Sequence, residues 1–122
     1  MSFFKNLLNL FRYPENLIDL TPDELEERIR NHEYRSEVAL IDVRTTVEYK
    51  GGHIHGAMSF PLGSEEQIAL KVEKDRPVIL ICKTGHRSQS AAAALFQLGF
   101  QNVSHLKGGM DAWRKKGKPT VY

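Results

Sequence analysis

The sequence predicts a single α/β domain built on a parallel sheet with helices on both faces. Its 122 residues are close to the commonest size of one domain. Short apolar runs alternate with helical segments, and two of the runs, residues 38–43 and 78–82, are almost continuously apolar. Such runs are typical of strands that helices cover on both sides. Their alternation with helices implies right-handed crossover connections and a parallel sheet.

The first elements are an apolar run over residues 17–20 and a helix over residues 22–31. Thr21 supplies an N-cap, Pro22 a first-turn proline and Glu24 the third residue of a capping box. Residues 64–67 repeat the capping-box pattern and predict a second helix that runs to about residue 74.

The remaining elements follow from apolar runs and from turn residues between them. Gly99 is suited to the left-handed position that ends a helix, from which Phe100 can fold back onto Leu95. The predicted strands cover residues 38–43, 58–61, 78–82 and 103–106, and the other helices cover residues 88–98 and 109–116.

Composition excludes several classes of function. Seventeen Lys and Arg against fifteen Asp and Glu give a net charge of +2, too small a bias to indicate a nucleic-acid partner. A 41% hydrophobic share together with 26% charged residues indicates a folded domain and not a disordered chain. With one cysteine, no intrachain disulfide can form, which fits a reducing compartment, so we expect a cytoplasmic location.

Residues 1–15 are expected to form an amphipathic extension. Phe4, Leu7, Leu8 and Phe11 are spaced as one helical stripe, which is too short to span a bilayer and unlike a secretory signal. The stripe has few basic neighbours, so we predict that it packs against protein, either its own domain or a second copy in a homodimer. Weak attachment to a membrane surface and organelle targeting are the competing explanations of the stripe.

Cys82 is the candidate nucleophile. It ends the strongest predicted strand, and ligands of parallel α/β sheets bind at the carboxyl ends of the strands. The next residues form a short cationic loop before a helix, so backbone N–H groups and the helix N-terminus favour both a thiolate and a bound anion. A cysteine at the end of an apolar run is usually a buried small hydrophobe, but packing gives no reason for the loop behind it.

Roles are assigned to the neighbours of Cys82 by their position. Asp42 and Ser88 are expected to support the loop, while Arg44 either pairs within the fold or contacts substrate. His53 and His55 alternate and, with one cysteine, make no convincing metal site, so neither a metal nor another cofactor is expected. The predicted substrate-binding residues are Lys83, Thr84, Gly85, His86, Arg87 and Arg44.

Four motifs in order resemble those of the rhodanese-homology family, over residues 16–119 and so apart from a short tail at 120–122. They are Asp42-Val43-Arg44, then Glu48 with Gly52-His53-Ile54-His55-Gly56-Ala57, then Cys82 to Ser88, then Gly108-Gly109-Met110-Asp111-Ala112-Trp113. The resemblance implies a five-stranded parallel sheet and a persulfide on Cys82. It is closest to the single-domain thiosulfate sulfurtransferases, and the Gly-Ser-Gly-Val-Thr loop of the mercaptopyruvate branch is absent from the sequence.

The resemblance also implies the partners. The Cys82 thiolate would take sulfur from thiosulfate or another donor, and the acceptor, whether a thiol, cyanide or a protein, must be external because no second cysteine exists. A cysteine phosphatase or arsenate reductase is the rival enzyme class, but its loop has five residues between Cys and Arg, and four separate Cys82 from Arg87 here. A persulfide carrier would share the chemistry of Cys82 but not the acceptor, and a binding module of the same family would have no catalytic role.

Overall fold

The computed structural model describes residues 14–31 and 36–122, which form one five-stranded parallel sheet in the order β1-β5-β4-β2-β3. The predicted α/β class and parallel sheet are therefore confirmed. The strands are β1 (Ile18–Leu20), β2 (Ala39–Asp42), β3 (Met58–Ser59), β4 (Val78–Ile81) and β5 (Val103–Leu106). The helices are α2 (Pro22–Arg30), α4 (Thr46–Lys50), α5 (Glu65–Lys71), α6 (Arg87–Gln97) and α7 (Gly109–Lys115).

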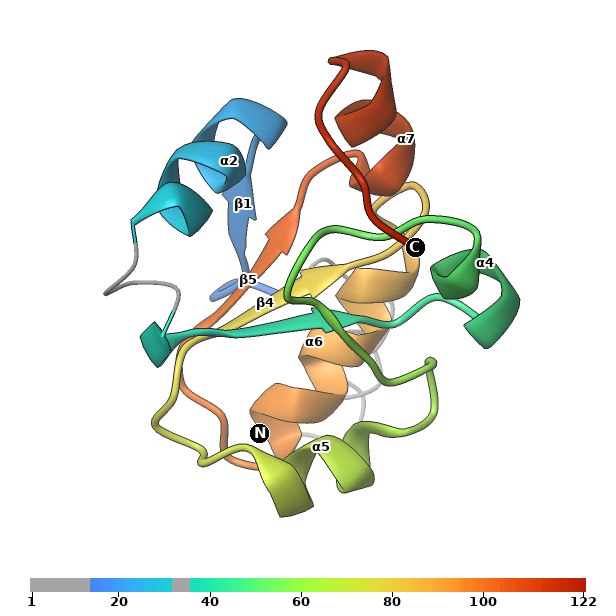
Figure 1. The fold of residues 1–122 in the computed structure, drawn as a ribbon. Helices are drawn as coiled ribbons and strands as arrows, with labels where there is room; N and C mark the ends of the chain where they lie inside the picture. The colour runs from blue at the N-terminus through green and yellow to red at the C-terminus, as the bar shows by residue number, and fades with distance from the viewer. Residues whose placement is uncertain (1–13, 32–35) are drawn as a thin grey trace.

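Helices cover the sheet on both faces, α5 and α6 on one and α2 and α7 on the other (Figure 1). Successive residues of a strand point to opposite faces, so each central strand contributes to two separate cores. In β4, Val78 and Leu80 pack with α5 and α6, whereas Ile79 and Ile81 pack with α2 and α7. Cys82 continues the first of these series and belongs to the core beneath α6.

Local signals in the sequence explain where several elements begin and end. The capping box of Thr21 and Glu24 forms as predicted, with both reciprocal hydrogen bonds present. Helix α6 ends with Gly99 at a φ of +101°, and the N–H of Phe100 donates to the carbonyl of Leu95 at 3.0 Å. This arrangement is the predicted left-handed helix end.

The helix predicted from Ser64 begins there, as α5 starts at Glu65, but its predicted cap bond and its predicted end are wrong. Ser64 makes no side-chain cap bond, because its φ of −99° and ψ of 21° are not the extended conformation of an N-cap. The helix that follows ends at Lys71 rather than near residue 74, since Val72 takes an extended conformation and is buried in the core. Helix α4 was not predicted, although Thr45 and Glu48 form a complete capping box at its start.

The structure describes the C-terminal end of the chain but not residues 1–13. The predicted N-terminal stripe lies outside the described residues. The C-terminal tail is bonded to the domain, since Val121 and His53 exchange two backbone hydrogen bonds of 2.8 and 2.9 Å. Within residues 14–31 and 36–122, no helix is long and apolar enough to cross a membrane.

Candidate active site

Cys82 lies at the carboxyl end of the central strand β4, directly before the loop that leads into α6. The residue is fully buried, and its sulfur is enclosed by the turn that follows. The N–H of Gly85 donates to Sγ at 2.9 Å, and the hydroxyl of Ser88 lies 3.5 Å from Sγ. A backbone N–H can only donate, so Sγ is the acceptor of this hydrogen bond.

Gly85 gives the loop its shape. Its φ is +96°, a conformation that side-chain-bearing residues rarely adopt, and a Cβ at this position would stand 3.1 Å from the backbone N of Gly108. The conformation of the loop and the closeness of Gly108 therefore both require glycine at position 85.

The loop is held from behind by the start of α7. Gly109 approaches so closely that a Cβ there would stand 2.4 Å from the carbonyl oxygen of Cys82. The N–H of Met110 donates to that same oxygen at 2.8 Å, and the N–H of Asp111 donates to the carbonyl of Lys83 at 2.9 Å. The glycine pair at the start of α7 thus allows that helix to approach and hold the backbone of Cys82 and Lys83.

Arg87 forms a bidentate ion pair with Glu48 across the site. Its Nη1 and Nη2 donate to Oε1 and Oε2 of Glu48 at 2.7 and 2.9 Å, and both side chains are about two-thirds covered. The hydrogen bonds from Arg87, with help from Thr45, lower the pKa of Glu48 from 4.5 to about 2, although burial opposes the change. The same pair raises the pKa of Arg87. The pair joins α4 to the first turn of α6.

The Glu48–Arg87 pair is expected to make a pH-dependent contribution to the free energy of unfolding. Because the pKa of Glu48 is lowered on folding, the contribution is complete above pH 4.5 and is lost as pH falls toward about 2. We expect Glu48→Gln to lower Tm by about 5 °C at pH 7, which corresponds to roughly 1 kcal/mol in a domain of this size. The Tm difference from wild type, measured by thermal melting, should shrink between pH 4.5 and 2.

Glu73→Gln, at an exposed position, is the matched control and should change Tm little at any pH. A Glu48→Gln deficit that is equal at pH 3 and pH 7 would contradict the assigned role of the pair.

Lys83, Thr84 and His86 are on the outer side of the loop, and the side chains of Lys83 and Thr84 meet other polar groups there. Lys83 reaches Asp111 of α7, with Nζ 3.1 Å from Oδ2, and the Thr84 hydroxyl lies 3.1 Å from Nδ1 of His86. Both permanent cations of the loop are therefore paired with carboxylates. The sequence suggested that Lys83 and Arg87 would bind an anion. Because both are paired, a larger share of such binding falls to the backbone N–H groups of the loop.

Arg44 pairs within the fold, which is one of the two roles that the sequence left open for it. Its side chain is 3% exposed, its guanidinium forms three hydrogen bonds with the carboxylate of Asp42, and Nη2 also donates to the carbonyl of Gly52 at 2.9 Å. The expectation that Arg44 binds substrate is not supported by this geometry, because the group is used within the fold. The pKa of Arg87 is raised chiefly by its hydrogen bonds to Glu48, and the charge of Asp42 is the smallest of the contributing causes.

Ser88 is placed to support the loop, since its hydroxyl lies within hydrogen-bond distance of the carbonyl of Gly85, at 3.1 Å. The structure adds two residues that sequence reasoning missed. Nδ1 of His105 lies 2.7 Å from the Ser88 hydroxyl, and Nε2 lies 2.7 Å from Oδ1 of Asp19. His105 stands in a short buried strand without a local motif, so no pattern in the sequence marked it.

The first histidine of the second motif, His53, has structural contacts, whereas His55 lies at an exposed turn. The ring of His53 stacks on that of Tyr49 at 3.8 Å, and its Nδ1 lies 2.9 Å from the carbonyl oxygen of Tyr49. Among the described residues, no three His, Cys, Asp or Glu side chains gather where they could hold a metal ion.

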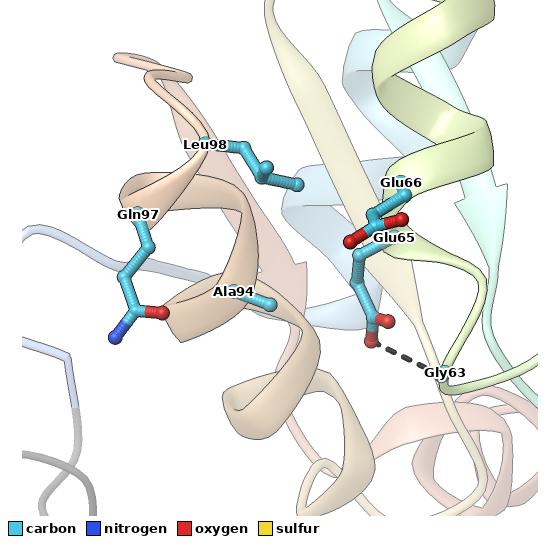
Figure 2. Close-up of a pocket in the computed structure, with 6 residues that line it drawn as sticks. All are labelled: Gly63, Glu65, Glu66, Ala94, Gln97 and Leu98. Atoms are coloured by element: carbon cyan, nitrogen blue, oxygen red, sulfur yellow. Dashed lines mark hydrogen bonds between the residues drawn. The ribbon is translucent and has the colours of Figure 1, made fainter.

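A separate hollow lies between α5 and α6 (Figure 2). Its lining includes Ala94 and Leu98 from the α6 side and Glu65, whose carboxylate accepts from the N–H of Gly63 at 3.2 Å. Cys82 is not among the residues that line it. The hollow is therefore distinct from the loop between β4 and α6 that holds Cys82.

Comparison with known proteins agrees with this architecture. The model of the rhodanese-like domain matches residues 21–116. The chain belongs to the rhodanese-like domain family. A crystal structure of the Alr3790 protein from Anabaena sp. superposes with a TM-score of 0.77 at 31% identity, covering 84% of this chain and 81% of that one.

Named relatives of this rhodanese-like domain are sulfurtransferases. A sulfurtransferase from Allochromatium vinosum is 34% identical over 84% of this chain and 94% of its own length. The thiosulfate sulfurtransferase GlpE of Pseudoalteromonas translucida is 33% identical over 65% of this chain and 75% of its own length. The probable adenylyltransferase/sulfurtransferase MoeZ of Mycobacterium tuberculosis is 42% identical over 84% of this chain, which spans only 26% of that protein.

Proposed function

We propose that this rhodanese-like domain is a thiosulfate sulfurtransferase that carries sulfur as a persulfide on Cys82. The observation that carries the proposal is the 2.9 Å hydrogen bond from the N–H of Gly85 to Sγ of Cys82, within a turn that joins the central strand to α6. Relatives named sulfurtransferase and thiosulfate sulfurtransferase support it.

The proposed reaction has two halves. In the first, the Cys82 thiolate attacks the outer sulfur of thiosulfate, an S–S bond forms to Cys82, and the S–S bond of thiosulfate breaks with its electron pair leaving on sulfite. In the second, a thiolate or cyanide attacks the outer sulfur of the persulfide. The S–S bond to Cys82 breaks, and its electron pair stays on Sγ, which restores the thiolate. The acceptor is external, because Cys82 is the single cysteine of the chain.

Each group of the loop has a distinct role in this proposal. The backbone N–H of Gly85 and the N-terminus of α6 stabilise the negative sulfur. Arg87, fixed by Glu48, holds the first turn of α6 in place and adds positive charge beside the anion. Lys83, Thr84 and His86 form the rim that thiosulfate meets first.

The spacing of the loop favours sulfur over phosphate. Four residues separate Cys82 from Arg87, one fewer than in the loops of cysteine phosphatases that this motif resembles. In addition, both terminal nitrogens of Arg87 donate to Glu48, whereas a phosphate loop requires the guanidinium for the ligand.

The direct test is the intact mass of the protein after incubation with thiosulfate in the absence of reducing agents. We expect one added sulfur atom, removed again by cyanide, and no hydrolysis of p-nitrophenyl phosphate by the same preparation. An unchanged mass together with phosphatase activity would replace this proposal with the rival enzyme class. An adduct with a different persulfide donor but none with thiosulfate would favour a persulfide carrier.

The cellular setting follows from the same chemistry. A free thiolate that must alternate with a persulfide is best kept in a reducing compartment, so we extend the proposal to a cytoplasmic protein. A thiol, cyanide or a protein serves as the acceptor, and neither a metal nor an organic cofactor takes part in the scheme.

A further inference from the structure

A chain of polar side chains leads away from Cys82 on the side opposite the loop rim; it is buried at Ser88 and His105, and its last member, Asp19, has a side chain that is 42% exposed. Sγ lies 3.5 Å from the hydroxyl of Ser88, that hydroxyl lies 2.7 Å from Nδ1 of His105, and Nε2 of His105 lies 2.7 Å from Oδ1 of Asp19. Ser88 is fully buried and His105 is 2% exposed. Burying a hydroxyl and an imidazole costs free energy unless both are hydrogen-bonded. The contacts of Ser88 and His105 with each other and with their neighbours offset that cost.

The parallel sheet brings these residues together from three elements. Asp19 and His105 are direct partners in the register between β1 and β5. Their side chains point to the face covered by α6, because Leu20 and Leu106, the next residues of both strands, belong to the opposite core. Ser88 approaches from the first turn of α6. The contact thus depends on residues that are 17 and 86 positions apart in sequence.

Elementary hydrogen-bond rules fix the direction of the chain. An ionised carboxylate only accepts, so Nε2 of His105 carries hydrogen and donates to Asp19. In a neutral imidazole Nδ1 is then an acceptor, which the Ser88 hydroxyl satisfies by donation. The hydroxyl has a single hydrogen, and its 2.7 Å contact with Nδ1 is shorter than its 3.1 Å contact with the carbonyl of Gly85. The hydroxyl oxygen is left as an acceptor for the S–H of Cys82.

We propose that His105 is a positioning residue that takes the proton of Cys82 through Ser88, with Asp19 holding its ring. This inference rests on the proposed role of Cys82 as the nucleophile. Ser88 and His105 would do for Cys82 what an adjacent base does for any weak nucleophile, with the base oriented by a third group.

The proton transfer is balanced within the chain. The S–H bond of Cys82 breaks as its proton passes to the oxygen of Ser88, while the O–H bond of Ser88 breaks as its own proton passes to Nδ1 of His105. Sulfur keeps the electron pair as thiolate, and His105 becomes an imidazolium beside the carboxylate of Asp19. Nδ1 then donates to Ser88, whose hydroxyl donates to the thiolate, so both ionic states are fully hydrogen-bonded.

A purely structural role is the competing explanation, in which the chain only ties the edge strand β1 and β5 to α6. Such a role would affect stability but not the balance between thiol and thiolate. Other groups near Cys82 also bear on that balance and must be separated from His105. From the other elements packed around the site these are the pairs Glu48–Arg87, Asp42–Arg44 and Lys83–Asp111, together with His86.

The test is a pH titration of the ultraviolet absorbance of the thiolate in the full chain. Because Cys82 is the single cysteine, subtracting the titration of Cys82→Ser isolates its signal. We expect His105→Asn, which cannot accept the proton, to move the midpoint upward by about one pH unit or more. Ser88→Ala should do the same, and Asp19→Asn, which keeps an acceptor but loses the charge, should move it less.

Two histidine variants serve as comparisons. His55→Asn lies at an exposed turn between α4 and β3 and should leave the midpoint of the thiolate titration unchanged. His86→Asn measures the influence of the histidine in the loop after Cys82. A titration of His105→Asn that coincides with wild type, in a protein shown by circular dichroism to be folded, would overturn the proposal. If His105→Asn does not fold, unchanged midpoints in both Ser88→Ala and Asp19→Asn would overturn it equally.

The titration uses no sulfur donor, so it separates this inference from the proposed function. If the midpoint rises in His105→Asn but the wild-type protein takes no sulfur from thiosulfate, the proton transfer from Cys82 to His105 is supported and the thiosulfate sulfurtransferase proposal is refuted. With thiosulfate as substrate, kcat/KM of His105→Asn should fall about tenfold or more near pH 6 and recover at high pH, where solvent removes the proton.

Discussion

Cys82→Ser is expected to abolish both the persulfide adduct and turnover with thiosulfate, while the protein stays folded. A serine hydroxyl occupies nearly the same space and can accept from the N–H of Gly85, so the loop keeps its hydrogen bonds. The alcohol is not ionised near neutral pH and is a far weaker nucleophile than a thiolate. We expect sulfite release to fall to the rate without enzyme.

The measurement combines intact mass, sulfite release and a thermal melt. Because Cys82 belongs to the core beneath α6, a hydroxyl there costs about 1–3 kcal/mol if it is left unpaired. The Tm of Cys82→Ser is therefore the necessary control, and Cys82→Ala, which has no polar atom, separates the loss of the nucleophile from the burial of a hydroxyl. Retained turnover in a folded Cys82→Ser protein would end the proposed mechanism.

The position of Cys82 between a central strand and a loop before a helix could be predicted because these residues are continuous in the sequence. The apolar run ends in Cys82, and a cationic loop with Lys83, Gly85 and Arg87 follows at once. This segment can therefore be recognised without knowing what the rest of the chain contributes. The strands were predicted for the same reason, since a stretch such as residues 78–82 reveals burial without reference to the rest of the chain. Local signals gave the helix ends at Thr21 and Gly99.

The partners of the loop could not be predicted in this way. Arg87 pairs with Glu48 over 39 positions, Lys83 with Asp111 over 28, and His105 with Asp19 over 86. Each pairing depends on the strand order, which places β2 beside β4 for the pair Arg87–Glu48 and β5 between β1 and β4 for the other two. Sequence alone showed the cations but not the carboxylates that neutralise them.

Short helices were also difficult, although for a different reason. The pair Thr45 and Glu48 is a capping-box signal for α4, but that helix has only five residues and no buried face, so no apolar period marks it. Ser64 carried the same signal and makes no cap bond. The pattern at Ser64 still marks the start of α5, but the cap bond itself forms only where the backbone before the helix is extended, as at Thr21 and Thr45.

The second large effect is expected at Gly109, where Ala should both destabilise the protein and disable the loop. Gly109 has a φ of +60°, and an added Cβ would stand 2.4 Å from the oxygen of Cys82 and 2.5 Å from the carbonyl carbon and oxygen of Lys83. These are backbone atoms, so no side chain can rotate away to relieve the contact. Either α7 or the loop must move.

Gly117→Ala is the matched control for backbone strain. Gly117 has a φ of +70°, close to that of Gly109, but an added Cβ would meet nothing within 4 Å. Its substitution should cost only the left-handed conformation, about 1–2 kcal/mol, or roughly 5–10 °C in Tm for a domain of this size. Turnover by Gly117→Ala should stay near that of wild type, because the site is built elsewhere.

Gly109→Ala should lower Tm by at least about twice as much as Gly117→Ala, since a clash with backbone is added to the same strain. Moving the start of α7 also lengthens the 2.8 Å bond from Met110 to the carbonyl of Cys82, so the sulfur should lose its alignment with the N–H of Gly85. We therefore expect kcat to fall at a temperature where the variant is still folded. Equal losses of Tm in the two variants, with full turnover in both, would show that the close approach of Gly109 does not hold the nucleophile in place.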